Sequence, residues 1–122
     1  MSLRGRFGTE NPESTERVVA DIGDERERQF TKWGPQHHPD GTTIEAKPLA
    51  DAAKAYCDAQ AALGLVTWKD ILTEEFFEAL AEEDPAALRK ELVQVAAVAA
   101  AWVEDLDSRP QFADVHDLGG EG

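Results

Sequence analysis

The fold is decided by residues 68–106, which read WKDILTEEFFEALAEEDPAALRKELVQVAAVAAAWVEDL. Apolar residues in this stretch recur at intervals of three and four, the spacing that places side chains on one face of an α-helix. Asp84 and Pro85 interrupt the pattern, and this pair is typical of the cap and first turn of a new helix. The stretch therefore predicts two consecutive helices joined by a tight turn.

Carboxylates occupy unexpected positions on these two predicted helices. Glu75 falls inside the apolar stripe of the first helix and Glu78 lies at its edge; the stripe comprises Trp68, Ile71, Leu72, Phe76 and Ala79. Glu91 lies on the shoulder of the second stripe, with Gln94 further round; that stripe comprises Leu88, Leu92, Val95, Ala99, Trp102, Val103 and Leu106. A carboxylate turned toward a core is costly unless it is paired or binds a metal, and hard cations such as Mg²⁺ take carboxylate oxygens. The alternative is a row of solvated glutamates, but the position of Glu75 argues against it.

The acidic residues resemble the motif of a known family. The chain reads Glu74-Glu75-Phe76-Phe77-Glu78, then twelve residues (79–90), then Glu91-Leu92-Val93-Gln94. This resembles the Glu-Glu-x-x-Glu and Glu-x-x-Asp pair of the all-α nucleoside triphosphate pyrophosphohydrolases, the MazG-like superfamily. The chain departs from that pattern at Gln94, where the family has aspartate.

The resemblance implies a function and a set of site residues. Glu75, Glu78, Glu91 and the position of Gln94 would hold Mg²⁺, with Mn²⁺ as a substitute, and Glu74 or Glu75 would orient or deprotonate a water molecule. The family cleaves (deoxy)nucleoside triphosphates to the monophosphate and pyrophosphate, a nucleotide-pool house-cleaning reaction. An amide offers an oxygen but no charge, so Gln94 predicts weaker metal binding. A catalytically weak relative that binds nucleotides or serves as a helical interaction module therefore remains an alternative.

A further helix is expected upstream, over residues 14–33, capped by Ser14 or Thr15 and ended by Gly34-Pro35. Residues 26–34 resemble the first-helix segment of related proteins, where polar and aromatic residues meet the nucleotide. The candidate substrate-binding residues are Gln29 and Trp33 for the base, and Arg28 and Lys32 for a phosphate. The alternative makes Trp33 a core anchor and leaves the other three solvated.

The connection over residues 33–48 has no periodicity, and connections of this length in small domains are usually functional or disordered. His37, His38 and Asp40 within it admit a zinc cluster, but adjacent histidines in a loop point in different directions. Pro48 suits the first turn of another helix, which Gly64 can end. Thr67 and Asp70 then resemble a capping box for the helix that follows.

Chain length and net charge limit the folds and partners that are possible. The 122 residues predict one domain, and the expected helices make it all-α. The resemblance implies a four-helix MazG-like bundle over residues 14–108, between flexible ends at 1–13 and 109–122. The acidic balance argues against nucleic acid as a partner, although a metal cluster can still bind a nucleotide. No run long enough to span a membrane and no signal peptide is visible, and the single Cys57 suggests a reducing compartment, so a cytoplasmic protein is expected.

The helix with the glutamates carries more apolar surface than one core can cover. Phe77 and Leu80 lie off its main stripe and, with Phe76, make the helix apolar on more than one face. A second copy of the chain could cover this surplus, so a homodimer or homotetramer is expected to complete the bundle. The family resemblance implies the same assembly.

Overall fold

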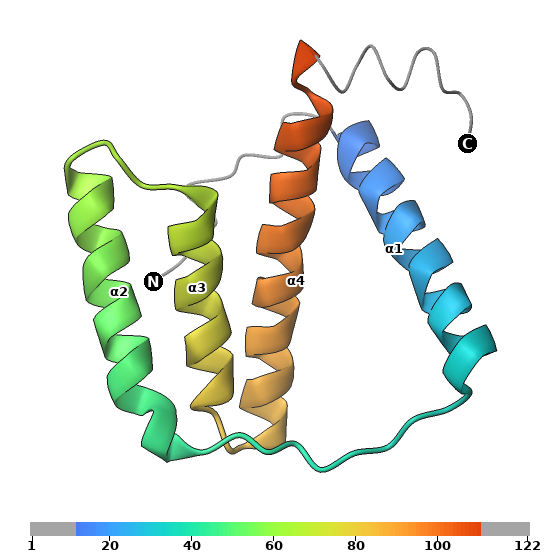
Figure 1. Ribbon diagram of the computed structural model, residues 1–122, viewed down its shortest axis with the longest axis horizontal. Coiled ribbons are helices and arrows are strands. Elements are labelled where there is room, and N and C mark those ends of the chain that lie inside the picture. The colour runs from blue at the N-terminus through green and yellow to red at the C-terminus, as the bar shows by residue number, and fades with distance from the viewer. Residues whose placement is uncertain (1–11, 111–122) are drawn as a thin grey trace. The chain divides into compact units, whose positions relative to one another are not determined.

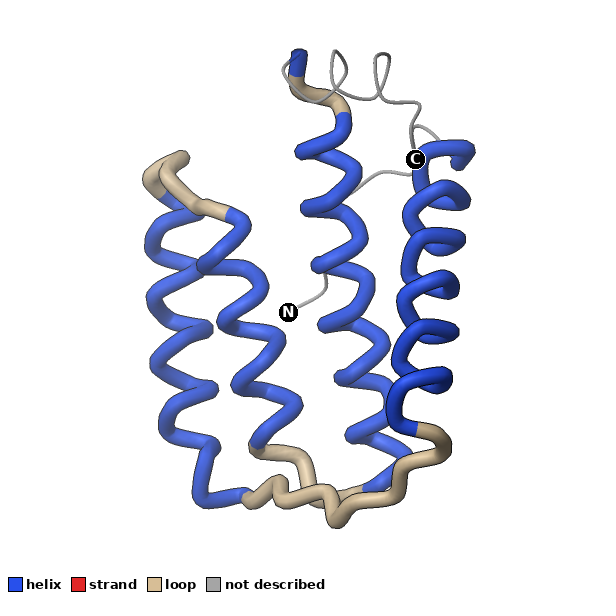
Figure 2. The backbone as a smooth tube through the Cα atoms, turned by 45° about the vertical axis from the view of Figure 1, so that its right-hand side comes forward, coloured by secondary structure: helices blue, strands red, loops and turns tan. Residues whose placement is uncertain are grey.

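The computed structural model describes residues 12–110, and this part of the chain forms four α-helices and one short 3-10 helix without any strand (Figure 2). The predicted all-α fold is confirmed. Residues 1–11 and 111–122, which make up most of the predicted flexible ends, lie outside the described residues. The described chain divides into two compact units, residues 38–99 and residues 12–37 with 100–110.

The unit of residues 38–99 contains η1 (Ile44–Ala46), α2 (Lys47–Ala62), α3 (Trp68–Leu80) and the first part of α4 (Pro85–Asp107). Helices α2 and α3 lie side by side (Figure 1). Small or compact side chains are buried on these helices, which permits close packing; they are Ala50 and Cys57 on α2 and Ile71 and Ala79 on α3. Leu88 and Val98 are the buried side chains of α4.

The helix ends in this unit follow the predicted local chemistry. Gly64 has a φ of +73°, and the Leu65 N–H donates to the Gln60 carbonyl at 2.8 Å, so α2 ends in a left-handed turn. Thr67 and Asp70 form a capping box, in which Thr67 Oγ1 accepts from the Asp70 N–H at 3.2 Å and Asp70 Oδ2 accepts from the Thr67 N–H at 3.1 Å. These contacts determine where α3 begins.

The other unit contains α1 (Pro12–Trp33) and the end of α4. Helix α1 begins two residues before the predicted start, because Pro12 suits the first helical turn. Thr15 consequently lies inside the helix instead of capping it, and its Oγ1 donates to Glu104 Oε2 of α4 at 3.0 Å. The helix ends at Gly34 as predicted, where a φ of +70° accompanies a 2.7 Å hydrogen bond from the Gly34 N–H to the Phe30 carbonyl.

The predicted apolar faces are partly wrong. Phe76, Leu92 and Val103 were expected to face the core but are 48%, 51% and 38% exposed, whereas Val98, outside the predicted stripe, is 1% exposed. The second half of α4 is apolar nearly all round, so a 3.6-residue period cannot select one face. The buried face of α4 therefore differs from the predicted stripe: it includes Leu88 and Val98 but not Leu92.

Two adjacent valines in α1 test the assignment of buried and exposed faces. Val18 is 2% exposed and Val19 is 56% exposed. We expect Val18→Ala to lower the free energy of unfolding in urea by about 1–3 kcal/mol, because it removes buried methyl groups, whereas Val19→Ala should change it by about 0.5 kcal/mol or less. Equal effects of the two substitutions would show that Val18 is not a core residue.

Candidate metal centre

Three glutamates of α3 bring their carboxylates together. One oxygen each from Glu74, Glu75 and Glu78 lies within 4.8 Å of the other two. Positions 74 and 78 are one helical turn apart and Glu75 is adjacent, so the three side chains share one side of the helix. The predicted convergence of Glu75 with Glu78 is confirmed, and Glu74 belongs to the same cluster.

The cluster lies on the buried face of α3. Glu74 and Glu75 are each 0% exposed, between the buried Ile71 and Ala79. The sequence predicted the inward position of Glu75, but it placed Glu74 only beside the site. Both side chains lie on the side of α3 that also buries Ile71 and Ala79.

The buried oxygens have no hydrogen-bond partner. This holds for both carboxylate oxygens of Glu74, both of Glu75 and Oε2 of Glu91 on α4. A buried polar atom without a partner costs free energy, and a buried carboxylate without a counter-charge costs more. The site therefore needs positive charge, which a proton or a cation can supply.

The pKa values of these carboxyls reflect the same need. Burial, followed by the negative charges of Glu78, Glu74 and Glu91, raises the pKa of Glu75 to about 7. Burial also raises the pKa of Glu78, with a further contribution from Glu74. The pKa of Glu91 is raised by burial and then by the charges of Glu78 and Glu82. Glu91 is thus close enough to the α3 cluster for its charge to affect the pKa of Glu75.

The donor set fits a hard divalent cation. Carboxylate oxygens are the ligands that such ions prefer, and an ion among them would partner oxygens that are otherwise unpaired. Glu74, Glu75 and Glu78 could hold it, with Glu91 close enough to interact electrostatically with Glu75 and Glu78. Gln94 follows Glu91 by three positions on α4 and is half-buried.

A cavity of about 300 Å³ lies beside the cluster. Acidic side chains from α3, α4 and the turn between them line it together with two lysines of α2; these residues include Glu78, Glu82, Glu91, Lys47 and Lys54. The lysines were not predicted as site residues. Their spacing of seven positions, which places them on one side of α2, was the available signal.

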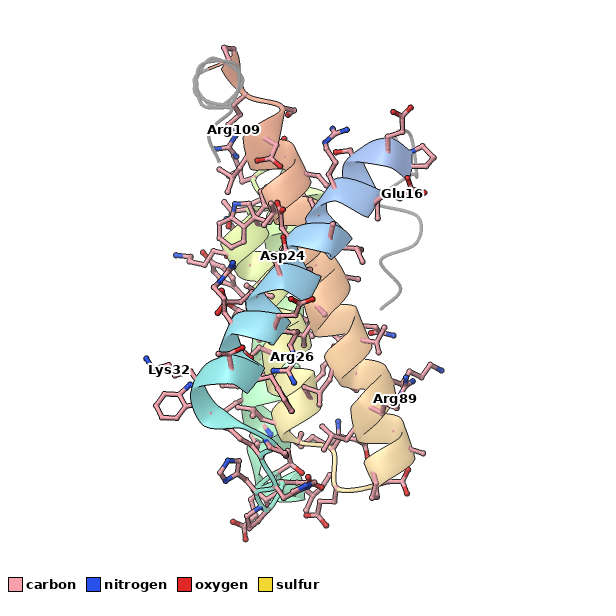
Figure 3. The ribbon with its side chains drawn as sticks, turned by 90° about the vertical axis from the view of Figure 1, so that its right-hand side faces the viewer. Glu16, Asp24, Arg26, Lys32, Arg89 and Arg109 are labelled. Carbon is pink, nitrogen blue, oxygen red and sulfur yellow. The ribbon has the colours of Figure 1, made fainter. Side chains whose placement is uncertain are left out.

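The predicted substrate-binding residues gather at the end of α1. Arg28, Gln29, Lys32 and Trp33 line a cavity of about 740 Å³ in the unit that contains residues 12–37. Trp33 is 60% exposed, so the alternative of a core anchor is wrong. The Lys32 ammonium lies 4.9 Å from the centre of the Trp33 ring, and Figure 3 shows Lys32 and Arg26 projecting from α1.

Two of these four side chains are engaged locally. Arg28 forms an ion pair with Glu25 at 2.8 Å, which lowers the pKa of Glu25, and Gln29 Oε1 accepts from Arg26 at 2.5 Å. The four predicted substrate-binding residues therefore line one cavity at the end of α1. The glutamates belong to residues 38–99, the other compact unit.

The histidine loop does not form a comparable site. His37, His38 and Asp40 are exposed, and within residues 12–110 the group of three convergent ligand residues is Glu74, Glu75 and Glu78. The zinc cluster considered for this loop has no support in the structure.

No protein-family model, curated protein or solved structure matches the chain. Among the described residues, no helix combines the length and apolar character that crossing a membrane requires.

The raised pKa of Glu75 predicts how stability changes with pH. The folded state holds a proton on Glu75 up to about pH 7, whereas the unfolded chain releases it near the ordinary value of 4.5. This group therefore stabilises the fold below about pH 4.5, and its contribution is lost as pH rises toward 7. We expect Glu75→Gln to reduce the fall in unfolding free energy between pH 5 and 8 by an amount on the order of 3 kcal/mol, measured by urea denaturation with EDTA present.

Glu13→Gln is the matched control, because Glu13 is exposed on α1. A pH profile for Glu75→Gln that coincides with the wild-type profile would contradict the assignment. Mg²⁺ should stabilise the wild type more at pH 8 than at pH 5, because metal binding requires deprotonated carboxyls.

Proposed function

We propose that the protein is a Mg²⁺-dependent pyrophosphohydrolase that converts (deoxy)nucleoside triphosphates to the monophosphate and pyrophosphate, as nucleotide-pool house-cleaning in the cytoplasm. The observation that carries the proposal is the pair of fully buried, unpartnered carboxylates at Glu74 and Glu75, with Glu78 converging on them. The resemblance of these residues and Glu91 to the MazG-like motif supplies the reaction class.

The cluster suits the chemistry of polyphosphate hydrolysis. This reaction requires neutralised phosphate charge, a positioned water molecule and a group that takes its proton. A divalent cation held by Glu75, Glu78 and Glu91 would neutralise phosphate charge and lower the pKa of a bound water. Mn²⁺ offers similar coordination and should substitute for Mg²⁺.

The proton and the leaving group have defined fates in this proposal. A water oxygen forms a bond to the α-phosphorus, the bond from that phosphorus to the bridging oxygen breaks, and pyrophosphate departs with the bond electrons. An unpartnered oxygen of Glu74 or Glu75 accepts the hydrogen bond of the attacking water and then its proton. The same burial that leaves these oxygens unpartnered limits competition from bulk water.

The resemblance assigns further contacts, to the base and to phosphate oxygens, to residues at the end of α1. Trp33 is exposed enough to stack on a base, and Gln29 can hydrogen-bond one. Arg28 and Lys32 supply positive charge for phosphate oxygens.

The test is a screen of common and modified nucleoside triphosphates with Mg²⁺, with pyrophosphate release as the measurement. We expect release with at least one nucleotide and a loss of roughly tenfold or more in Glu78→Gln, the magnitude typical of a damaged metal site. Calorimetry should show a parallel loss of Mg²⁺ affinity in that variant. Glu13→Gln removes an exposed carboxylate elsewhere and should behave as the wild type.

Gln94 separates this function from the alternative of a catalytically weak relative. In an active enzyme, Gln94→Asp should lower the Mg²⁺ concentration needed for half-maximal rate, because an anionic ligand favours a hard cation. An inactive wild type that gains activity through Gln94→Asp would establish the weak relative. No change in metal dependence or rate would place Gln94 outside the site.

We also propose that the protein forms a homodimer or homotetramer through apolar surface of residues 38–99. Phe76 is 48% exposed, with the half-buried Phe77 and Leu80 nearby in sequence. A groove of about 380 Å³ runs along α4, and its lining includes Leu88, Leu92, Val93 and Ala96. A second copy of the chain would remove this surface from water.

Light scattering at micromolar concentration should therefore give at least twice the chain mass of 13.4 kDa. Leu92→Lys should shift the protein toward the monomer, because it places charge in the apolar groove. Leu63→Lys is the control, since Leu63 is 68% exposed after α2 and does not line the groove. A wild-type monomer would refute the assembly.

A further inference from the structure

Helix α2 presents two lysines to the cavity beside the glutamates. Lys47 and Lys54 are seven positions apart, two turns of helix, so they point in nearly the same direction. Three positions after each comes a buried residue, Ala50 and Cys57 respectively. The lysines thus lie along the edge of the buried face of α2, where they line the same cavity as Glu78 and Glu91.

Each lysine is held by an ion pair within its own helix. Lys54 Nζ lies 2.7 Å from Asp58 Oδ2, and Lys47 Nζ lies 3.0 Å from Asp51 Oδ1. The side chains of Lys54 and Asp58 are 45% and 46% exposed. Pairs of this kind contribute little to stability, so either ammonium can change its partner at small cost.

Lys54 is close to the glutamate cluster without neutralising it. The hydrogen bond with Asp58 raises the pKa of Lys54 most, and the charges of Glu74 and Glu78 raise it further. The oxygens of Glu74 nevertheless have no hydrogen-bond partner. The cavity therefore has the carboxylates of Glu78, Glu82 and Glu91 on one side, and on the α2 side the ammonium groups of Lys47 and Lys54 beside the carboxylate of Asp51.

We propose that Lys54 binds a phosphate oxygen of a polyphosphate chain whose neighbouring oxygens are held at the glutamate cluster through a divalent cation, with Lys47 further along the same cavity. The inference rests on the proposed function and adds a positioning residue from a helix outside the family motif. A polyphosphate chain carries more negative charge than one divalent cation neutralises, and the lysines supply the remainder. The roughly 300 Å³ cavity gives such a chain space between these two sides.

The test uses inorganic tripolyphosphate, which has no base or sugar. Calorimetry on the full chain should show tripolyphosphate binding in the presence of Mg²⁺, weakened roughly tenfold or more in Lys54→Met, the effect of losing a hydrogen bond between charged groups. Mg²⁺ binding without tripolyphosphate should be unchanged or tighter, because removal of Lys54 relieves repulsion of the cation. Lys47→Met should weaken tripolyphosphate binding less.

Matched variants separate a specific contact from altered charge or folding. Lys69→Met removes the same charge from an exposed position of α3 outside the cavity and should leave both affinities at wild-type values. Lys54→Arg keeps the cation and should retain most of the tripolyphosphate affinity. Lys54→Gln is a second neutral variant beside Lys54→Met. Thermal unfolding of each variant verifies that it is folded.

The outcomes distinguish this inference from the proposed function. Wild-type affinity for tripolyphosphate in both neutral variants, or no tripolyphosphate binding by the wild type, would overturn the role of Lys54. Tighter Mg²⁺ binding with unchanged tripolyphosphate binding would make Lys54 only a counter-ion of the glutamates. Lys54-dependent binding without hydrolysis of any nucleotide would support the phosphate contact and refute the enzyme.

Discussion

The burial of two adjacent, unpartnered carboxylates is the constraint on which the site depends. Glu74 and Glu75 are fully covered on a helix of 13 residues, and Glu78 and Glu91 add negative charge to their surroundings. Covering them without positive charge costs free energy that a small domain can hardly spare. Protons relieve this cost at low pH and a cation can relieve it at neutral pH. The pH dependence of stability and any binding of a cation would therefore answer the same electrostatic requirement.

Features set by local chemistry were predictable from the sequence. The capping box of Thr67 and Asp70 formed with aspartate in place of the usual glutamate or glutamine, and Gly64 took the left-handed conformation that ends α2. Asp84 Oδ2 accepts from the Ala87 N–H at 2.9 Å, as its position before Pro85 suggested. Each interaction spans a few residues, so the sequence contains all of its participants. The inward position of Glu75 was predictable because it falls inside the apolar stripe of α3, whose Ile71 and Ala79 are buried.

Features set by contacts between helices were less predictable. Helix α4 has apolar residues on several faces, and only packing decides that Val98 is covered while Leu92 is 51% exposed. The exposure of Trp33 was also not predictable, because an amphipathic pattern does not reveal which aromatic side chain packs against another helix. The position of Lys54 beside Glu78 was missed because it arises from the pairing of α2 with α3. Periodicity within one helix carries no information about such pairing.

The chain is strongly acidic, yet the proposed substrate is an anion. The two are compatible because repulsion between charges in salt solution acts only over a short distance. A net charge of −13 repels anions at a distance, but at physiological ionic strength the field of an exposed charge decays over about 8 Å. In the proposed function, a small polyphosphate within the cavity would interact mainly with the charges that line it. Lys47 and Lys54 lie there among acidic side chains, so a cation held by the glutamates would have to supply further positive charge. A nucleic acid would also have to lie against the exposed acidic surface, where no single site can compensate for repulsion along its length. If the proposed function holds, the same acidic chain would accept a compact anion and disfavour an extended one, because only the compact anion could lie wholly beside local positive charge.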